Sequence, residues 1–587
     1  MGAGLLLFVA MSVAAPPEAS AGVHDARLAQ LLEEAWDGTM AAAPVWATQL
    51  GDARFDDRLD DNTAAGRERF RAQQVRWLER ARKLGGLDEG DALHRDVFVR
   101  LADDGLRADA ACRTAEWAVS ARSNALTYAV DVGRERTFAD RDEVEAFVRR
   151  YDALAAYVAA ETENLRGGMR EGRVASRASV AKALEAVESE LRAPPTEAAL
   201  LGVLRAEHPA LGPGDRSLLE TRVRTAARGP LRHALVEYRD FLRDELLDAA
   251  RPDGREGVVW LPGGEACYAA RIRQETSTDR SAAELHQLGL DELGRIHADM
   301  LEIGAKRFGT RDLPSLLARL RDDPELHFRT REEVEQTAAA ALARAQAAVP
   351  RVFGRLPKAD CVVKPIPDHE APYTYIAYYW PAAPDGSSPG VYYVNSWAPE
   401  TRTRFDAEAL AWHEAVPGHH LQIAFANELG ALPLFRRHAS FTVFVEGWAL
   451  YAERLADELG LYSDDLQRLG MLGFDAWRAS RLVVDTGLHA EGWTRAEAEA
   501  FLLQNTPLAK NNVVNEVDRY ISWPGQALGY KTGQVELLRI RADARSALGD
   551  RFDLRGFHDV VLSGGALPID LVEARVRAWV RAGGAAP

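Results

Sequence analysis

The sequence predicts a mainly α-helical protein with one small β-sheet. Ala, Leu, Glu and Arg dominate residues 25–250, and apolar side chains recur there at intervals of three and four, as at Leu28, Leu31 and Leu32. Only residues 360–398 are rich in β-branched and aromatic side chains broken by Pro and Gly, which predicts short strands. Helical patterns return after that stretch and continue to the end of the chain.

Residues 1–21 have the pattern of a secretory signal peptide. A short apolar run, Leu5 to Met11, leads to Ala19-Ser20-Ala21, although no Lys or Arg precedes the run. The alternative is a wrongly assigned start of the protein. We expect an exported protein, periplasmic or extracellular. No cysteine follows the run to support a lipid anchor, and no later apolar run approaches the length of a membrane span.

Pro- and Gly-containing turns near residues 252–265 predict a boundary within one continuous family domain. We expect an N-terminal helical subdomain at 22–260 and a catalytic subdomain at 261–587. Ser281-Ala-Ala-Glu284 has the pattern of a capping box and predicts the start of a long helix.

The composition fits a soluble globular protein. Of the 587 residues 47% are hydrophobic and 27% charged, and the net charge is −16. No basic stripe suggests a nucleic-acid partner. Cys112, Cys267 and Cys361 lie far apart, so at least one is unpaired within the chain, and we expect buried thiols.

The strongest functional signal is the segment His413-Glu-Ala-Val-Pro-Gly-His-His-Leu-Gln422. Zinc hydrolases use a helical His-Glu pair and a second His, because catalytic zinc takes three protein ligands and keeps one open position. His413 is the expected first ligand, and Glu414 is the expected general base. In the usual spacing the second His comes four residues after the first, but Pro417 occupies that position here.

Pro417 and Gly418 suggest how the motif could still bind a metal. On an unbroken helix His419 would lie about 9 Å along from His413, and His420 about 10.5 Å, which is too far for a shared ion. Pro417 cannot donate the helical hydrogen bond and Gly418 is permissive, so the pair predicts a kink or bulge. A two-residue bulge would bring His419 to the second ligand position.

The third ligand is expected from a following helix. Glu446 lies on a strongly apolar helical face, where an unpaired carboxylate is costly and a metal would explain it. The alternative is a structural ion pair with an Arg. Glu453, seven residues later on roughly the same face, is placed to orient a metal ligand.

Several motifs together resemble a family of bacterial proteins grouped as domain of unknown function 885, which is regarded as related to the gluzincin metallopeptidases. The resemblance covers nearly the whole mature chain, and it includes the metal segment, residues 44–52, 386–395, 446–451, 481–489 and 523–530. It implies a multi-helix gluzincin-like architecture with a small sheet beside the active-site cleft. It also implies Zn²⁺ with a Glu on a second helix as the third ligand.

The thimet oligopeptidase and Taq carboxypeptidase families offer a more distant likeness. Their His-Glu-x-Gly-His-Ala-Leu motif aligns with Gly418-His419-His420-Leu421, which favours His419 as the second ligand and leaves His420 as the alternative. Their Gly-Tyr segment resembles Gly529-Tyr530, so Tyr530 is the first candidate to stabilise the oxyanion.

Other polar groups are candidates for the site. Tyr520 and His489 could also assist, although core packing explains each equally well. Arg481, Asp485 and His489 share one helix face, so Asp485 could orient a donor and Arg481 could bind a substrate carboxylate. A structural Arg481–Asp485 ion pair is the favoured alternative.

The strand at residues 391–395 lies just before the metal segment. Extended peptides often bind by adding to a sheet edge, so Tyr393 and Asn395 could contact substrate. An ordinary core hairpin is the equal alternative.

Together these features predict a zinc-dependent hydrolase, a metallopeptidase that cleaves oligopeptides. His413, His419 and Glu446 would hold Zn²⁺, and Glu414 would move the proton. The alternatives are a metal-dependent amidase acting on a small non-peptide amide, and a non-catalytic helical binding protein. A peptide or small amide is the expected partner.

Overall fold

The computed structural model describes residues 19–134, 136–368, 371, 374, 376–383, 388–430 and 432–585. The expected signal peptide lies outside these residues except for its last three positions. Tyr373 and the turn at 384–386, which belong to the predicted strand region, also lie outside the described residues. No helix in the described part of the chain is both long enough and apolar enough to cross a membrane.

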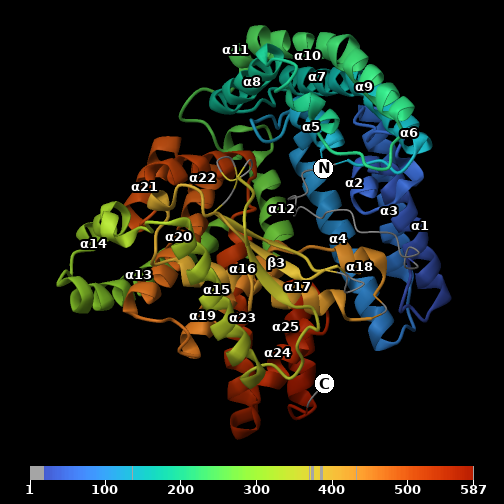
Figure 1. Ribbon diagram of the computed structural model, residues 1–587. Helices are drawn as coiled ribbons and strands as arrows, with labels where there is room; N and C mark the ends of the chain where they lie inside the picture. The colour runs from blue at the N-terminus through green and yellow to red at the C-terminus, as the bar shows by residue number, and fades with distance from the viewer. Residues whose placement is uncertain are drawn as a thin grey trace. The chain divides into compact units, whose positions relative to one another are not determined.

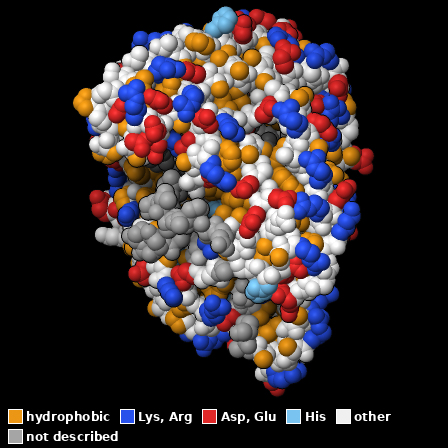
Figure 2. Space-filling model, turned by 90° about the vertical axis from the view of Figure 1, so that its right-hand side faces the viewer, with side chains coloured by type: hydrophobic (Ala, Val, Ile, Leu, Met, Phe, Trp, Pro, Cys, Tyr) orange, Lys and Arg blue, Asp and Glu red, His pale blue; other side chains and the backbone are white. Residues whose placement is uncertain are grey.

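The fold is mainly α with a small sheet, as predicted, and in the described residues this sheet has three strands of mixed orientation. The chain forms two compact units. The first unit is mainly His24–Cys267, and the second is mainly Tyr268–Glu491 with Arg495–Pro587. On the face shown in Figure 2, acidic and basic side chains are interspersed.

The regular elements described in the first unit are all helices (Figure 1). Its core includes Phe147, Tyr151, Leu235 and Tyr238. The helices are α1 (Ala26–Ala42), α2 (Pro44–Gln49), α3 (Ala64–Lys83), α4 (Glu89–Cys112), α5 (Ala125–Gly133), α6 (Arg141–Asp152), α7 (Leu154–Arg170), α8 (Arg177–Arg192), α9 (Pro213–Arg228), α10 (Pro230–Phe241), α11 (Leu247–Ala249) and the start of α12 (Gly264–Thr276).

A disulfide links Cys112 at the end of α4 to Cys267 in α12. The expectation of three buried thiols was therefore wrong, because the fold brings together two cysteines that are 155 residues apart in sequence. Cys361 remains a free, buried thiol. A disulfide is consistent with an oxidising, exported location.

The second unit contains the sheet and the remaining helices. The predicted capping box is present, because the Ser281 side chain accepts from the Glu284 backbone and the Glu284 side chain accepts from the Ser281 backbone. The helices are α13 (Ala282–Phe308), α14 (Leu313–Asp322), α15 (Arg331–Ala348), α16 (Ala407–Glu414), α17 (His419–Asn427), α18 (Leu434–His438), α19 (Thr442–Glu458), α20 (Asp465–Thr486), α21 (Arg495–Asn505), α22 (Lys510–Ser522), α23 (Leu528–Leu548), α24 (Leu554–Leu562) and α25 (Ile569–Arg581).

The sheet has the strand order β1 (Cys361–Pro365), β3 (Gly390–Val394), β2 (Ala377–Trp380). The central strand β3 runs parallel to β1 and antiparallel to β2. Both of its edges are already paired, so substrate cannot add to it as a further strand. That hypothesis for residues 391–395 was wrong. The edge strand β2 contacts α16 and α17, which carry the His-rich segment (Figure 1).

Helices α19 and α23 cross at a contact between two glycines. A Cβ on Gly447 would lie 2.5 Å from the Cα of Gly533, so neither position tolerates a side chain. Glu446 immediately precedes Gly447 on α19. Tyr530 lies about one helical turn before Gly533 on α23.

Candidate metal centre

The predicted break in the His-rich helix is present. Helix α16 ends at Glu414 and α17 begins at His419, with a cis peptide bond between Val416 and Pro417 in the connection. The indole N–H of Trp448 in α19 donates to the Pro417 carbonyl over 2.9 Å and so ties the connection to the third-ligand helix. A Cβ on Gly418 would lie 2.0 Å from the His413 carbonyl oxygen, so the connection can close only with glycine there.

Three side chains converge across this break. The Nε2 atoms of His413 and His419 lie 3.5 and 3.6 Å from the same carboxylate oxygen of Glu446. Their ligand atoms all lie within 4.8 Å of one another, and the two imidazole rings are nearly perpendicular. The structure therefore gives a buried His-His-Glu group that could hold a metal ion.

The spacing fits a small tetrahedral ion. Two ligands that each lie about 2.1 Å from a tetrahedral zinc ion are about 3.4 Å apart. The two His-to-Glu446 distances, 3.5 and 3.6 Å, are close to that value. Two imidazole nitrogens and one carboxylate oxygen are also a donor set that zinc accepts, with one position left open.

The charges of the group favour a positive centre. Burial opposes a charge on His413, but hydrogen bonds to Glu446 and Glu453 outweigh it and raise the pKa of His413 to about 9. Burial likewise opposes the charge on Glu446, and the two histidines hold its pKa well below the ordinary value. A bound cation would supply the same positive charge as the protonated imidazole.

His420 is not part of the group. Its Nδ1 lies 3.1 Å from the Tyr379 hydroxyl in β2, and its Nε2 lies 3.1 Å from the Ala359 carbonyl oxygen, so both ring nitrogens have partners. Burial lowers the pKa of His420 to about 4 and keeps the ring neutral. Of the two adjacent histidines, His419 belongs to the candidate group and His420 does not.

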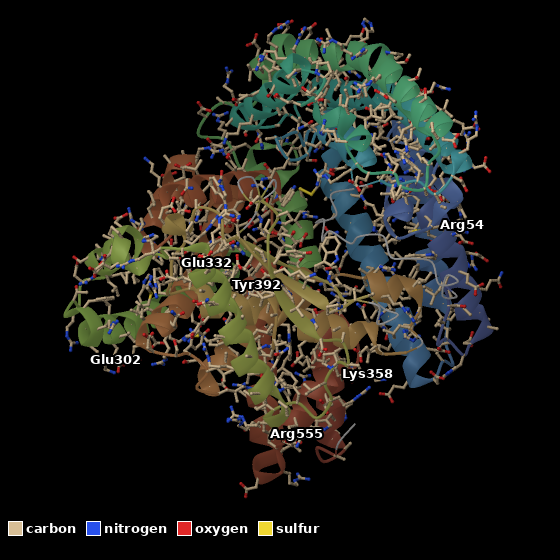
Figure 3. All side chains as sticks on the ribbon, viewed as in Figure 1. Arg54, Glu302, Glu332, Lys358, Tyr392 and Arg555 are labelled. Atoms are coloured by element: carbon tan, nitrogen blue, oxygen red, sulfur yellow. A yellow bond between two sulfur atoms is a disulfide. The ribbon has the colours of Figure 1, made fainter. Side chains whose placement is uncertain are left out.

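Two further carboxylates border the group. The Nδ1–H of His413 donates to Glu453 over 2.8 Å, and this hydrogen bond leaves Nε2 to face Glu446. Glu414 is half-buried at the end of α16. Burial raises the pKa of Tyr392 in β3, and the nearby charge of Glu414 raises it further. Tyr392 is labelled in Figure 3.

Comparison with known proteins supports a family assignment for the whole chain. A model of a family described as "Bacterial protein of unknown function (DUF885)" matches residues 44–576. The chain belongs to this family. No curated protein matches the sequence.

Two solved structures, from Colwellia psychrerythraea and Shewanella oneidensis, have a similar fold. A "putative lipoprotein" from Colwellia psychrerythraea is 27% identical, with a TM-score of 0.86, and the match covers 95% of this chain and 99% of that one. A "putative lipoprotein of unknown function" from Shewanella oneidensis is 20% identical, with a TM-score of 0.76, and the match covers 94% and 99%. The second match shows the fold alone.

The three candidate oxyanion donors, Tyr520, His489 and Tyr530, differ in the hydrogen bonds that their polar atoms already make. The Tyr520 hydroxyl donates to Glu516 over 2.6 Å, and His489 Nε2 faces the Tyr520 carbonyl oxygen at 2.9 Å. The Tyr530 oxygen accepts from Arg519 over 3.1 Å, and among the described residues its hydroxyl proton has no acceptor. Tyr530 is therefore the candidate whose proton remains available.

The Arg481–Asp485 ion pair is absent. Arg481 instead pairs with Glu516 of α22 at 3.0 Å. Asp485 accepts from the Tyr268 hydroxyl at 2.6 Å and from the Gly525 backbone at 3.0 Å. The i, i+4 spacing suggested a local pair, but tertiary partners on other helices took both side chains.

Tyr393 and Asn395 both contact residues outside the His-His-Glu group. Successive residues of a strand face opposite sides, and Tyr393 stacks on Tyr378 of β2 with ring centroids 5.0 Å apart. The Asn395 side chain donates to the Ala371 carbonyl and accepts from the Trp397 backbone. Tyr392, the strand neighbour of Tyr393, was not among the predicted site residues. It is the residue whose pKa responds to the charge of Glu414. The alternation of side chains along a strand was the sequence signal that could have identified Tyr392.

Arg478 was also missed. It is 5% exposed in α20, and burial lowers its pKa while the nearby charges of Glu453 and Glu446 oppose that change. Its position near the group could not be read from its sequence neighbours.

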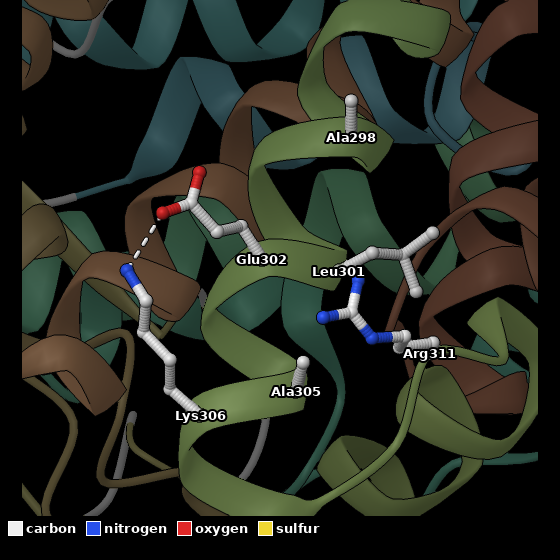
Figure 4. A pocket seen from close by; sticks show the side chains of 6 residues that line it. All are labelled: Ala298, Leu301, Glu302, Ala305, Lys306 and Arg311. Carbon is white, nitrogen blue, oxygen red and sulfur yellow. Dashed lines mark hydrogen bonds and ion pairs between the residues drawn. The ribbon is translucent and has the colours of Figure 1, made fainter.

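Two other features lie elsewhere. His24, Asp88 and the buried Asp91 form a second cluster of possible ligands in the first unit, but Asp88 caps α4 and Asp91 accepts two backbone N–H groups. A hollow beside α13 is lined by Ala298, Leu301, Glu302, Ala305, Lys306 and Arg311 (Figure 4). Its charged rim is occupied by the 2.6 Å Glu302–Lys306 ion pair, and it includes none of the residues of the His-His-Glu group.

Proposed function

We propose that this chain is a zinc-dependent hydrolase, specifically a metallopeptidase of gluzincin-like architecture that cleaves oligopeptides. The observation that carries the proposal is the convergence of His413 Nε2, His419 Nε2 and the Glu446 carboxylate at the spacing of a tetrahedral ion. Two histidines and one glutamate are one of the ligand sets that catalytic zinc sites use.

Each side chain has a proposed role. His413, His419 and Glu446 would hold Zn²⁺, and Glu453 would orient His413. Zinc bound there supplies Lewis-acid chemistry for the attack of water on an amide carbonyl. Glu414 would take the proton from the attacking water and pass it to the leaving amine. The half-buried position of Glu414 at the end of α16 suits a group that must reach substrate.

Tyr530 would stabilise the developing oxyanion. Its hydroxyl oxygen already accepts from Arg519, which orients the O–H and leaves its proton to donate elsewhere. The packing of α19 against α23 is consistent with the assignment, because Glu446 precedes Gly447 on α19 and Tyr530 lies three residues before Gly533 on α23.

The test is cleavage of a mixed peptide library by the zinc-loaded wild type and by Glu414→Gln. We expect the wild type to cleave, a chelator to abolish cleavage, and the variant to lose about 10²–10⁴-fold in rate, which is the usual contribution of a general base. Full activity in Glu414→Gln that contains stoichiometric zinc would refute the assigned base.

Two alternative functions make different predictions. A metal-dependent amidase would leave the peptide library intact and hydrolyse small non-peptide amides with the same dependence on Glu414. A non-catalytic binding protein would hydrolyse neither, whatever its metal content. The disulfide favours an exported enzyme that meets its substrate outside the cytoplasm.

A further inference from the structure

Two arginines of the second unit share a single carboxylate, and a third arginine lies one helical turn away without one. Arg481 in α20 pairs with one oxygen of Glu516 at 3.0 Å, and Arg519 in α22 lies 3.5 Å from the other. Arg478 lies one turn before Arg481, and no carboxylate of the described residues is within ion-pair distance of it. The cluster therefore carries an excess of positive charge in a largely buried setting, where unpaired charge is costly.

The arginines surround aromatic rings and are held in place by them. The guanidinium carbons of Arg478 and Arg481 lie 4.4 and 4.5 Å from the ring centre of Trp477. Arg481 also lies 4.3 Å from the ring centre of Tyr530. Stacking of this kind stabilises a cation without neutralising it, so the cluster is preorganised but still electrically unbalanced.

Donors in the cluster remain unused. Nη1 of Arg481 and the Nε atoms of Arg478 and Arg519 are buried and have no hydrogen-bond partner among the described residues. The contrast with the first half of α20 is clear. There the buried Asp475 pairs with both Lys531 and Arg454, and Glu292 also pairs with Lys531, so cations and carboxylates match.

The cluster adjoins the proposed active site. Arg519 donates to the hydroxyl of Tyr530, and Arg478 is close enough to Glu446 for that carboxylate to influence its charge. Arg519 and Glu516 retain 17% and 15% side-chain exposure, so a ligand can approach from their side. An anion bound here would lie next to the groups that we propose to act on the scissile bond.

We propose that Arg478, Arg481 and Arg519 bind a carboxylate of the peptide substrate. This group is the C-terminal carboxylate, and the enzyme cleaves near that end of the peptide. This inference rests on the proposed function and specifies its substrate class. The planar forked guanidinium matches a carboxylate, and three of them supply more donors than Glu516 can accept. An acidic side chain near the cleavage site would offer the same chemistry.

The test compares three probes that differ only in their carboxylate. They are acetyl-pentaalanine as the free acid, the same peptide as its C-terminal amide, and acetyl-tetraalanyl-glutamic acid α-amide. Binding is measured by calorimetry on zinc-loaded Glu414→Gln, and cleavage is measured on the wild type. We expect the free acid to bind about 10–100-fold more tightly than the plain amide, as for one or two charge-assisted hydrogen bonds. Equal binding of the glutamic acid probe would identify a side-chain carboxylate as the recognised group and overturn the C-terminal assignment.

Arg478→Gln is the most informative substitution, because it removes a charge without leaving a carboxylate unpaired. It should erase the preference for the free acid and leave zinc content unchanged, whereas Arg478→Lys should keep part of the preference. Arg468→Gln, an exposed arginine on the same helix, is the matched control and should bind all probes as the parent does.

The outcomes separate this inference from the proposed function. Zinc- and Glu414-dependent cleavage of acid and amide at equal rates overturns the inference and leaves the function standing. A preference in binding without cleavage of any peptide supports the inference and removes the peptidase proposal. A preference that survives Arg478→Gln and Arg481→Lys, or an absence of binding by every probe, overturns the inference.

Discussion

The Nδ1–H of His413 donates to Oε1 of Glu453 over 2.8 Å, and Glu453 is only 1% exposed. Glu453→Gln keeps a hydrogen-bond acceptor but removes the charge that makes the imidazole a stronger ligand. We expect zinc affinity to fall about 10–100-fold, measured by competition with a chromophoric chelator. Glu458→Gln on the exposed side of α19 is the control, and equal affinities for the two variants would contradict the role of Glu453.

The adjacent histidines should differ in their effect on the metal. His419→Ala removes one of three converging donors, so the purified variant should contain little zinc by elemental analysis. His420→Ala breaks contacts to Tyr379 and Ala359 only, so it should retain zinc even if it melts at a lower temperature. Zinc lost from His420→Ala and kept by His419→Ala would reverse the ligand assignment.

Gly418→Ala should disrupt the connection between the two metal-binding helices. The added methyl would lie 2.0 Å from the His413 carbonyl and 2.3 Å from that of Trp412, which forces the backbone to move. We expect a loss of at least about 1–3 kcal/mol in the free energy of unfolding, together with weaker zinc binding. Gly294→Ala is the comparison, since open space surrounds that helical glycine and alanine should be neutral or stabilising there. Similar unfolding curves for the two variants would count against the tight connection.

Tyr530→Phe should reduce kcat about 10²–10³-fold while KM changes little, because the lost hydroxyl is needed mainly for the oxyanion. Steady-state kinetics on a peptide that the wild type cleaves provide the measurement. Tyr151→Phe in the first unit removes a buried hydroxyl that bonds to the Leu200 carbonyl, and it should leave kcat unchanged. A Tyr530→Phe variant with wild-type kcat would exclude the proposed donor.

Asp485 should make stability depend on pH. Burial raises its pKa from 3.8 to about 7, against hydrogen bonds from Tyr268 and Gly525 that lower it. Between these pH values the folded chain binds more protons at this site than the unfolded chain, so the contribution of this group to stability falls as pH rises. Asp485→Asn cannot titrate. The melting temperature of the variant minus that of the wild type should therefore increase between pH 4.5 and pH 7.5. A difference that stays constant over this range would contradict the raised pKa of Asp485.

Local signals explain what the sequence predicted well. The capping box at Ser281 needs only residues 281–284, and the helical periodicities need only one turn of neighbours. The break after Glu414 was also local, because Pro417 and Gly418 encode it within a few residues. The position of His419 beside His413 followed from that break and from the motif.

Partners from distant segments explain what the sequence missed. Arg481 lies four residues from Asp485, yet Glu516 on another helix is its partner. The pairing of β3 on both edges depends on two strands outside residues 391–395, so its central position was not readable from that segment. The charge imbalance around Arg478 emerges only when α20, α22 and α23 are packed together.

The Cys112–Cys267 bond gives the chain a covalent ring. Every peptide bond from 113 to 266 lies inside that ring, which encloses helices α5 to α11. A protease that cuts one loop there opens the ring but releases no fragment, because the two pieces stay joined through sulfur. For a protein exposed to proteases, a first cut in this region leaves the molecule in one piece until a reductant or a second cut reaches it.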